Sequence, residues 1–353
     1  MGNLVKIVAT LGPSTSSADA IHSLANAGMD FARLNFSHGT HEEKKEMIDN
    51  IRSIEGKKIK IIQDLPGPKI RLGDIEEMVL EDNKLVQLTS NPGTDGAILV
   101  NFPDFSSLVE PGSIIFISDG KIKLKVLHVS AGMVSCIVEF GGPIKKGKGV
   151  NIQSSTANLR AVTYTDIDHI KFGVENNVDY IAVSFVRSGE DMEFARQVLS
   201  NLKSNIPLIA KIEKSEALDN LKDIIQKSDA VMIARGDLGT EIGVENVPLA
   251  QKRIIAMANK MKKPVITATQ MLYSMINNKT PTRAEVSDIA NAVLDGTDAL
   301  MFSDETAVGK NPDSVIEVAM KVVETIENAD KEVVEKLEAR DGDAYSHFLN
   351  SAA

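Results

Sequence analysis

Two strand-like segments end in charged residues that could act together on an anionic substrate. The first reads Ile209-Ala-Lys-Ile-Glu213 and the second Ala234-Arg-Gly-Asp-Leu-Gly239. Carboxylates at neighbouring strand ends, here Glu213 and Asp237, can share a divalent metal through their oxygens. A lysine beside them, Lys211, can neutralise negative charge that develops during a reaction. This pattern favours chemistry on a phosphate or carboxylate; the alternative is an ordinary set of surface ion pairs.

The composition argues against several classes of protein. The chain has 353 residues, of which 43% are hydrophobic and 25% charged, as is typical of a globular protein with a large core. A net charge of −10 argues against a broad nucleic-acid-binding surface. The single cysteine excludes an intrachain disulfide and a cysteine-rich metal site. The sequence shows no signal-peptide pattern and no membrane-spanning apolar run, so we expect a cytoplasmic protein without nucleic-acid or membrane partners.

Short β-branched runs alternate with longer amphipathic segments, which is typical of βα units. The predicted strands are 5–10, 29–36, 58–64, 178–185, 207–212, 230–235, 264–269 and 299–303. The predicted helices lie near 18–27, 41–54, 165–175, 189–202, 215–226, 246–261, 282–294 and 313–328. Thr282, with Glu285 three residues later, has the spacing of a capping box. Eight such units predict an α/β fold, a (β/α)8 TIM barrel.

The third unit departs from this pattern. After Asp64 the helical periodicity is lost, and short alternating strands are predicted at 85–89, 113–117, 121–126 and 134–138. We therefore expect a small all-β domain at 69–154, inserted after strand three. The catalytic barrel would be formed by 1–68 and 155–334, and a polar C-terminal tail would span 335–353.

Polar residues collect where the predicted strands end. In a TIM barrel the reacting groups lie at these ends, on the C-terminal face. Seven strands contribute there: Arg33, Asn35, Ser37 and His38; Asp64; Ser184 and Arg187; Lys211 and Glu213; Gly236 and Asp237; Thr269 and Gln270; Ser303 and Glu305. One polar end would mean little, because loops are polar, but seven on one face predict an active site.

Several of these segments closely resemble the pyruvate kinase family. They are 31–39, 209–213, 234–239, 268–272, 281–285 and 291–296, and the similarity runs in order from about residue 5 to 330. The resemblance implies a barrel whose inserted domain is a β-barrel that closes as a lid. It also implies Mg²⁺- or Mn²⁺-dependent transfer of a phosphoryl group from phosphoenolpyruvate to ADP, giving pyruvate and ATP.

Carried over residue by residue, the resemblance implies a role for each site residue. Glu213 and Asp237 would bind the metal, and Lys211 would stabilise the phosphoryl group in transit and the enolate left behind. Thr269, through water, would lie near the proton delivered to the enolate carbon. Arg33 and Ser184 would contact the substrate, and Gly236, Asp237 and Thr269 would hold its carboxylate. The nucleotide would be bound by Asn35, His38, Arg71 and Lys148. A monovalent cation would lie near Asn35, Ser37, Asp64 and Leu65.

The sequence departs from the family pattern after strand three, where Asp64-Leu-Pro-Gly-Pro-Lys-Ile-Arg71 has Lys69 in place of a glutamate. An ammonium can supply the positive charge of the potassium ion that many members use, and it would also repel that ion. We therefore predict activity without potassium; the alternative is that Lys69 merely points to solvent. Asp304 places an extra carboxylate near the expected nucleotide, and the hinge 151–155 lacks the usual Pro and Gly.

Typical members continue into a further α/β domain that this sequence lacks. The chain is then either a naturally short form or a truncated sequence, and these alternatives stay open. We expect it to lack that domain's effector site and to be a homodimer through the barrel or a monomer. Three functions are open on the sequence: an active pyruvate kinase, a metal-dependent lyase acting on pyruvate-like substrates, and a non-catalytic relative that binds phosphoenolpyruvate or nucleotide. Lys211, Glu213, Asp237 and Thr269 are all present, which favours the kinase.

Overall fold

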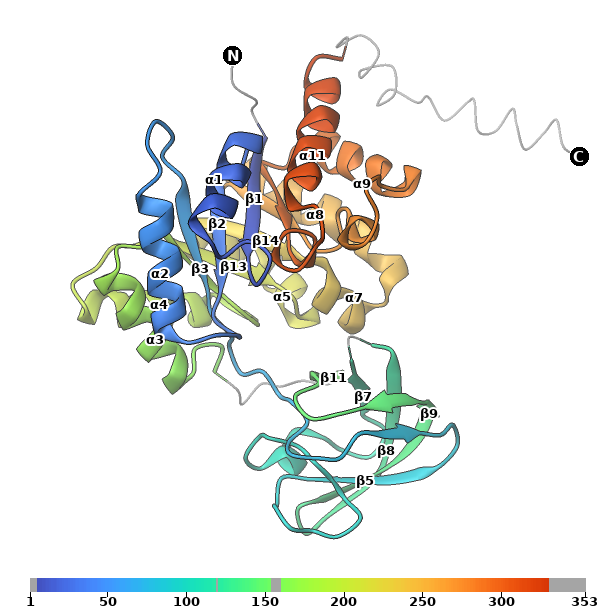
Figure 1. The fold of residues 1–353 in the computed structure, drawn as a ribbon. Helices are drawn as coiled ribbons and strands as arrows, with labels where there is room; N and C mark the ends of the chain where they lie inside the picture. The colour runs from blue at the N-terminus through green and yellow to red at the C-terminus, as the bar shows by residue number, and fades with distance from the viewer. Residues whose placement is uncertain (1–4, 119, 154–159, 330–353) are drawn as a thin grey trace, which may run out of the picture.

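The computed structural model describes residues 5–118, 120–153 and 160–329, and its centre is a closed barrel of eight parallel strands (Figure 1). In barrel order these strands are β1 (Lys6–Leu11), β2 (Phe31–Asn35), β3 (Lys60–Asp64), β12 (Tyr180–Val183), β13 (Leu208–Ile212), β14 (Ala230–Ala234), β15 (Val265–Ala268) and β16 (Ala299–Phe302). Every predicted barrel strand is present within three residues of its predicted ends. The TIM barrel is confirmed.

Helices cover the outside of the barrel. They are α1 (Ala18–Ala27), α2 (His41–Arg52), α3 (Tyr164–Glu175), α4 (Gly189–Asn201), α5 (Ser215–Asp219), α6 (Leu221–Lys227), α7 (Arg235–Ile242), α8 (Val247–Lys260), α9 (Arg283–Leu294), α10 (Asp304–Ala307) and α11 (Pro312–Glu327). The helix predicted at 215–226 is divided at Asn220 into α5 and α6. The capping box of Thr282 and Glu285 is confirmed at the start of α9.

The barrel interior has its own small core, which explains where the polar strand ends point. Val8, Ile62 and Ile209 belong to this core, whereas their neighbours along the strands pack outward against the helices. Side chains two residues apart in a strand share a face. Thr10, Asp64 and Lys211, two residues further along, therefore face into the barrel mouth.

The inserted domain forms two sheets around a separate apolar core (Figure 1). Its strands are β4 (Met78–Leu80), β5 (Leu85–Thr89), β6 (Ile98–Leu99), β7 (Ile114–Ile117), β8 (Ile122–Ser130), β9 (Met133–Phe140), β10 (Gly142–Ile144) and β11 (Val150–Gln153). The larger sheet has the order β11-β7-β8-β9-β5-β6, and β4 pairs with β10. Its two edges are linked through the isolated bridges Arg71–Gly149 and Leu72–Val100. Backbone hydrogen bonds extend these bridges: the Leu72 N–H donates to the Lys148 carbonyl at one edge, and the Gly73 N–H donates to the Leu99 carbonyl at the other. Segment 70–73 thus connects both edges of the sheet, as the expected β-barrel requires.

One buried carboxylate ties together the two connections between the barrel and the insertion. Asp166, at the start of α3, accepts hydrogen bonds from the Gly67 N–H at 3.1 Å, the Thr163 N–H at 2.8 Å and the Thr163 hydroxyl at 2.6 Å. Gly67 has φ 65°, and a Cβ there would lie 2.9 Å from the Phe185 ring, so glycine is required. The predicted hinge residues Ser154 and Ser155 and the tail 335–353 lie outside the described residues, and the exact domain bounds stay predictions.

Within the described part of the chain, no helix combines the length and apolar character needed to cross a membrane.

A histidine pair joins α2 to α3 and makes stability depend on pH. His41 Nε2 lies 2.7 Å from His169 Nδ1, and both rings pack against Phe172 or Phe36. Burial, and then the charge of His41, lower the pKa of His169 below 6.5. The unfolded chain therefore binds this proton more readily, so the contribution of His169 is present above about pH 6.5 and is lost as the pH falls below it.

We expect the wild-type protein to lose about 1 kcal/mol more unfolding free energy than His169→Gln between pH 7.5 and pH 5.5. Urea unfolding at both values measures this difference, with the exposed His22→Gln as the matched control. Equal losses in wild type and His169→Gln would contradict the assignment.

Candidate active site

A continuous chain of ion pairs crosses the barrel mouth. Arg33 Nε lies 2.6 Å from Asp64 Oδ2, and Asp64 Oδ1 lies 3.0 Å from Lys211 Nζ. Lys211 Nζ is also 3.0 Å from Glu213 Oε1. All four residues are buried. Two carboxylates thus alternate with two cations from strands β2, β3 and β13 and the residue just after β13.

The pKa shifts within this chain follow from burial and from the alternating charges. Burial alone would raise the pKa of Asp64, but the charges of Lys211 and Arg33 hold it below its ordinary value. Burial would lower the pKa of Lys211, but Asp64 and Glu213 raise it instead. Both groups are therefore charged at neutral pH.

Among the four residues of this ion-pair chain, Glu213 has too little positive charge around it to keep its pKa at the ordinary value. Burial raises its pKa, and Lys211 opposes this only in part, since the charges of Asp237 and Asp64 also raise it. A further cation beside Glu213 would stabilise its ionised form.

Ser184 and Phe185, directly after β12, hold this chain in place. The Ser184 hydroxyl oxygen accepts a hydrogen bond from Lys211 Nζ at 2.6 Å and donates to the Leu65 carbonyl at 2.7 Å. Phe185 adopts φ 55°, and its N–H donates to Glu213 Oε2 at 2.7 Å. A left-handed conformation at a bulky residue is strained, and such strain is concentrated at functional sites.

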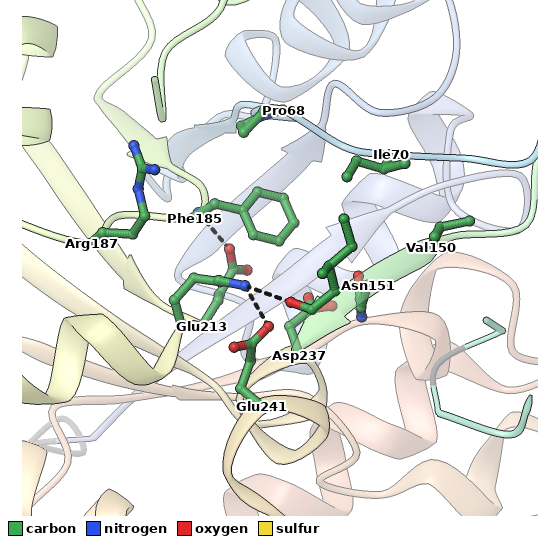
Figure 2. A pocket seen from close by; sticks show the side chains of 11 residues that line it. Pro68, Ile70, Val150, Asn151, Phe185, Arg187, Glu213, Asp237 and Glu241 are labelled. Atoms are coloured by element: carbon green, nitrogen blue, oxygen red, sulfur yellow. Dashed lines mark hydrogen bonds and ion pairs between the residues drawn. The ribbon is translucent and has the colours of Figure 1, made fainter. Parts of the chain in front are cut away.

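A pocket between the barrel and the inserted domain opens onto Glu213 and Asp237 (Figure 2). Phe185 and Arg187 line it from the barrel, and Val150 and neighbouring residues line it from the insertion. The Asp237 carboxylate has no hydrogen bond or ion pair with any described residue. It is available to a ligand.

The two carboxylates fit a divalent metal that is shared with a substrate. No group of three or more His, Cys, Asp or Glu side chains in the described ranges could hold a metal by itself. Mg²⁺ is commonly bound by one or two carboxylates together with substrate oxygens. Glu213 and Asp237 supply such a pair.

Thr269 and Gly236 meet next to this carboxylate pair, since Gly236 directly precedes Asp237 in the first turn of α7. The Gly236 N–H, in the first turn of α7, donates to the Thr269 hydroxyl oxygen at 2.9 Å, and this hydroxyl donates to the Ala268 carbonyl at 2.7 Å. Thr269 has φ 70°, and Arg235 fixes this strained turn by donating to the carbonyls of Ala268 and Thr269. Arg235 thus positions the site, and Asp288 binds its guanidinium at 2.7 Å.

Arg33, Asn35 and His38 line a second cavity, of about 900 Å³, together with Asp304 and other residues of the first and last βα loops. Asn35 Oδ1 accepts the Ser37 N–H at 3.0 Å. Burial lowers the pKa of His38, and four cations reinforce the shift: Arg71, Lys69, Lys44 and Arg33. Positive charges thus surround His38.

The predicted nucleotide residues of the inserted domain lie together at its base. Arg71 donates to the Gly147 carbonyl at 3.2 Å, and the Lys148 carbonyl accepts the Leu72 N–H at 2.8 Å. Lys69 is exposed, and its charge contributes to the lowered pKa of His38. The ion-pair partners of Asp64 are Arg33 and Lys211 rather than Lys69.

A buried ion pair that was not predicted from the sequence links the barrel to the insertion. Lys214 Nζ lies 2.5 Å from Glu241 Oε1 on α7 and 3.4 Å from the Ile152 carbonyl in β11. Asn151 Nδ2 also donates to the Thr240 hydroxyl at 3.3 Å. Lys214, which directly follows Glu213, could have been recognised in the sequence as a further charged residue at this strand end. Its partner Glu241 is brought close to it only by the fold.

The fold is a closed TIM barrel with a β domain inserted after its third strand, and buried charges are linked across the barrel mouth. These features define a class of barrel protein suited to anionic ligands. The chain belongs to the pyruvate kinase family, since residues 3–316 match the family described as the pyruvate kinase barrel domain.

Named relatives agree with this assignment. The chain is 44% identical over 333 residues to the pyruvate kinase of Staphylococcus epidermidis strain ATCC 35984, an alignment that covers 92% of this chain and 57% of that protein. It is 43% identical over 330 residues to the pyruvate kinase of Corynebacterium efficiens, covering 92% and 70%. It is 42% identical over 336 residues to pyruvate kinase 2 of Synechocystis, covering 92% and 57%. The chain thus spans little more than half the length of the first and third of these relatives.

Proposed function

We propose that this protein is a glycolytic phosphotransferase, a pyruvate kinase that converts phosphoenolpyruvate and ADP into pyruvate and ATP. The observation that carries the proposal is the chain of Arg33, Asp64, Lys211 and Glu213 beside Asp237. It combines two fixed cations for a phosphate with two carboxylates for a metal, and family membership supports the same reaction.

In the proposed reaction the bond between the phosphorus and the enol oxygen breaks, and an oxygen of the ADP β-phosphate forms the new bond to phosphorus. Arg33 and Lys211 bind the transferred group, and Lys211 stabilises the enolate oxygen left behind. The enolate then takes a proton at carbon to give pyruvate. Mg²⁺ or Mn²⁺ on Glu213 and Asp237, when bound, supplies positive charge to the substrate oxygens.

Gly236, Asp237 and Thr269 are proposed to receive the substrate carboxylate. The Gly236 N–H now donates to the Thr269 hydroxyl, so a carboxylate at this helix start would replace that hydroxyl as its acceptor. Thr269 could then orient water near the enolate carbon. Ser184 acts through Lys211, since its hydroxyl oxygen is bonded to that ammonium.

Asn35, His38, Arg71 and Lys148 are proposed to bind ADP, with the inserted domain closing over the site to exclude water. The contact of Lys214 with the Ile152 carbonyl supports such a closed arrangement. We further propose that potassium is not required at the region of Asn35, Ser37, Asp64 and Leu65, because Lys69 adds a tethered positive charge nearby. A cytoplasmic location, a homodimer through the barrel and the absence of nucleic-acid and membrane partners stay predictions.

The decisive experiment measures pyruvate and ATP formed from phosphoenolpyruvate and ADP with Mg²⁺. We expect equal amounts of both products and none without ADP. Pyruvate formed without ATP would favour a lyase-like or hydrolytic reaction and would contradict the kinase. Binding of phosphoenolpyruvate by folded protein without any turnover would favour the non-catalytic relative.

A further inference from the structure

Lys44 is a buried lysine that the proposed mechanism does not use. It lies in α2, and its side chain is only 6% exposed. Met47, Ile48 and Ile51 follow it at helical spacing on the same buried stripe. Lysine is almost never buried in this way unless it is paired.

No acidic side chain in the described ranges pairs with the Lys44 ammonium. Its neighbour Glu43 instead uses Oε2 to accept the Thr40 N–H at 2.8 Å, as part of the capping box of α2. Burial lowers the pKa of Lys44; the charge of Glu43 opposes this shift and the charge of Arg33 adds to it. Glu43 thus offsets the charge of Lys44 only in part, and no described carboxylate forms an ion pair with its ammonium.

The side chain of Lys44 lines the 900 Å³ cavity that also contains Arg33, Asn35 and His38. Gly39 packs beside the ammonium, since a Cβ built on it would lie 3.5 Å from Lys44 Nζ and 2.6 Å from Glu43 Oε2. Acidic residues line the same cavity, namely Glu43, Glu46 and Asp304, but Lys44 and Arg33 are the buried charges in it. One end of the cavity thus presents the buried positive charges of Lys44 and Arg33.

We propose that Lys44 binds a phosphate group of the nucleoside diphosphate in this cavity. The inference rests on the proposed kinase function and adds a nucleotide-binding residue to it. A cavity of this volume accommodates a ligand of nucleotide size. The nucleotide is favoured over phosphoenolpyruvate because Lys44 lines the cavity of Asn35 and His38, and not the pocket of Glu213 and Asp237.

Lys44→Met tests the proposal, since methionine keeps the length and apolar packing of the side chain but removes the charge. We expect the KM for ADP to rise on the order of 10- to 100-fold, with the KM for phosphoenolpyruvate unchanged and kcat at saturating ADP nearly unchanged. Calorimetric titration with ADP alone should show the same loss of affinity. Lys44→Arg should restore part of it.

Lys45→Met is the matched control, because Lys45 is exposed on the same helix and pairs with Asp49. Should Lys44→Met fail to fold by circular dichroism, Lys44→Gln replaces it. An unchanged affinity for ADP, or a loss confined to phosphoenolpyruvate, would overturn the proposal. The ADP titration needs no turnover, so it tests Lys44 even where the kinase assay fails.

Discussion

Lys211→Met is expected to lower kcat for pyruvate formation on the order of a thousandfold, with the barrel still folded. The ammonium of Lys211 is held by Asp64, Glu213 and Ser184 at distances between 2.6 and 3.0 Å. It is therefore fixed before the reaction, and no reorganisation is needed when negative charge develops on the enolate. Steady-state assays of pyruvate release measure the effect. Full activity in this variant would contradict the assigned role.

The same substitution should also reduce stability, because it leaves two buried carboxylates without their shared cation. Breaking a buried ion pair from one side typically costs about 3–5 kcal/mol. Mg²⁺ bound to Glu213 should recover part of this loss, so urea unfolding with and without Mg²⁺ separates the stability effect from catalysis. Lys263→Met is a suitable control, since Lys263 precedes β15 at the opposite end of the barrel and binds the Ser228 carbonyl.

Lys69→Glu is expected to make activity dependent on potassium. The substitution reverses a charge that acts on His38 beside the predicted cation region. We expect activity without potassium to fall on the order of tenfold or more and to recover when potassium is added, because the glutamate removes the tethered positive charge and attracts the ion in its place. Assays in potassium and in tetramethylammonium at equal ionic strength measure the difference.

Lys146→Glu is the matched charge reversal, since Lys146 is exposed in the insertion and pairs with Asp74. It should leave the response to potassium unchanged. A wild-type enzyme that requires potassium would contradict the tethered-cation hypothesis, as would a Lys69→Glu variant that ignores the ion.

The barrel could be predicted from sequence because its signals are local. Each strand is a short apolar run with a polar end, and strand alternation places Asp64 and Lys211 on one face. The way in which the inserted domain joins its two sheet edges could not be predicted, since bridges such as Leu72–Val100 depend on pairing between distant segments.

The unpredicted site features depend on tertiary contacts. Phe185 is bulky and of a type that favours β-strands, so its left-handed backbone could not be predicted from the sequence. The hydrogen bond from its N–H to Glu213 explains this conformation. Lys44 did leave a signal, because it occupies the apolar stripe of α2. A lysine on such a stripe can nevertheless be a surface residue with a buried stem, and the structure was needed to show its burial.

The double attachment of Asp166 has a consequence for how the chain tolerates its insertion. Gly67 and Thr163, on the two segments that connect the barrel to the insertion, both donate hydrogen bonds to the Asp166 carboxylate. The barrel therefore holds these two segments together whatever lies between them. The entropy of closing a loop grows only with the logarithm of its length. The loop-closure entropy for a whole inserted domain is therefore little larger than that for a short loop. The size of this insertion can change in evolution or by engineering without disturbing the parallel sheet.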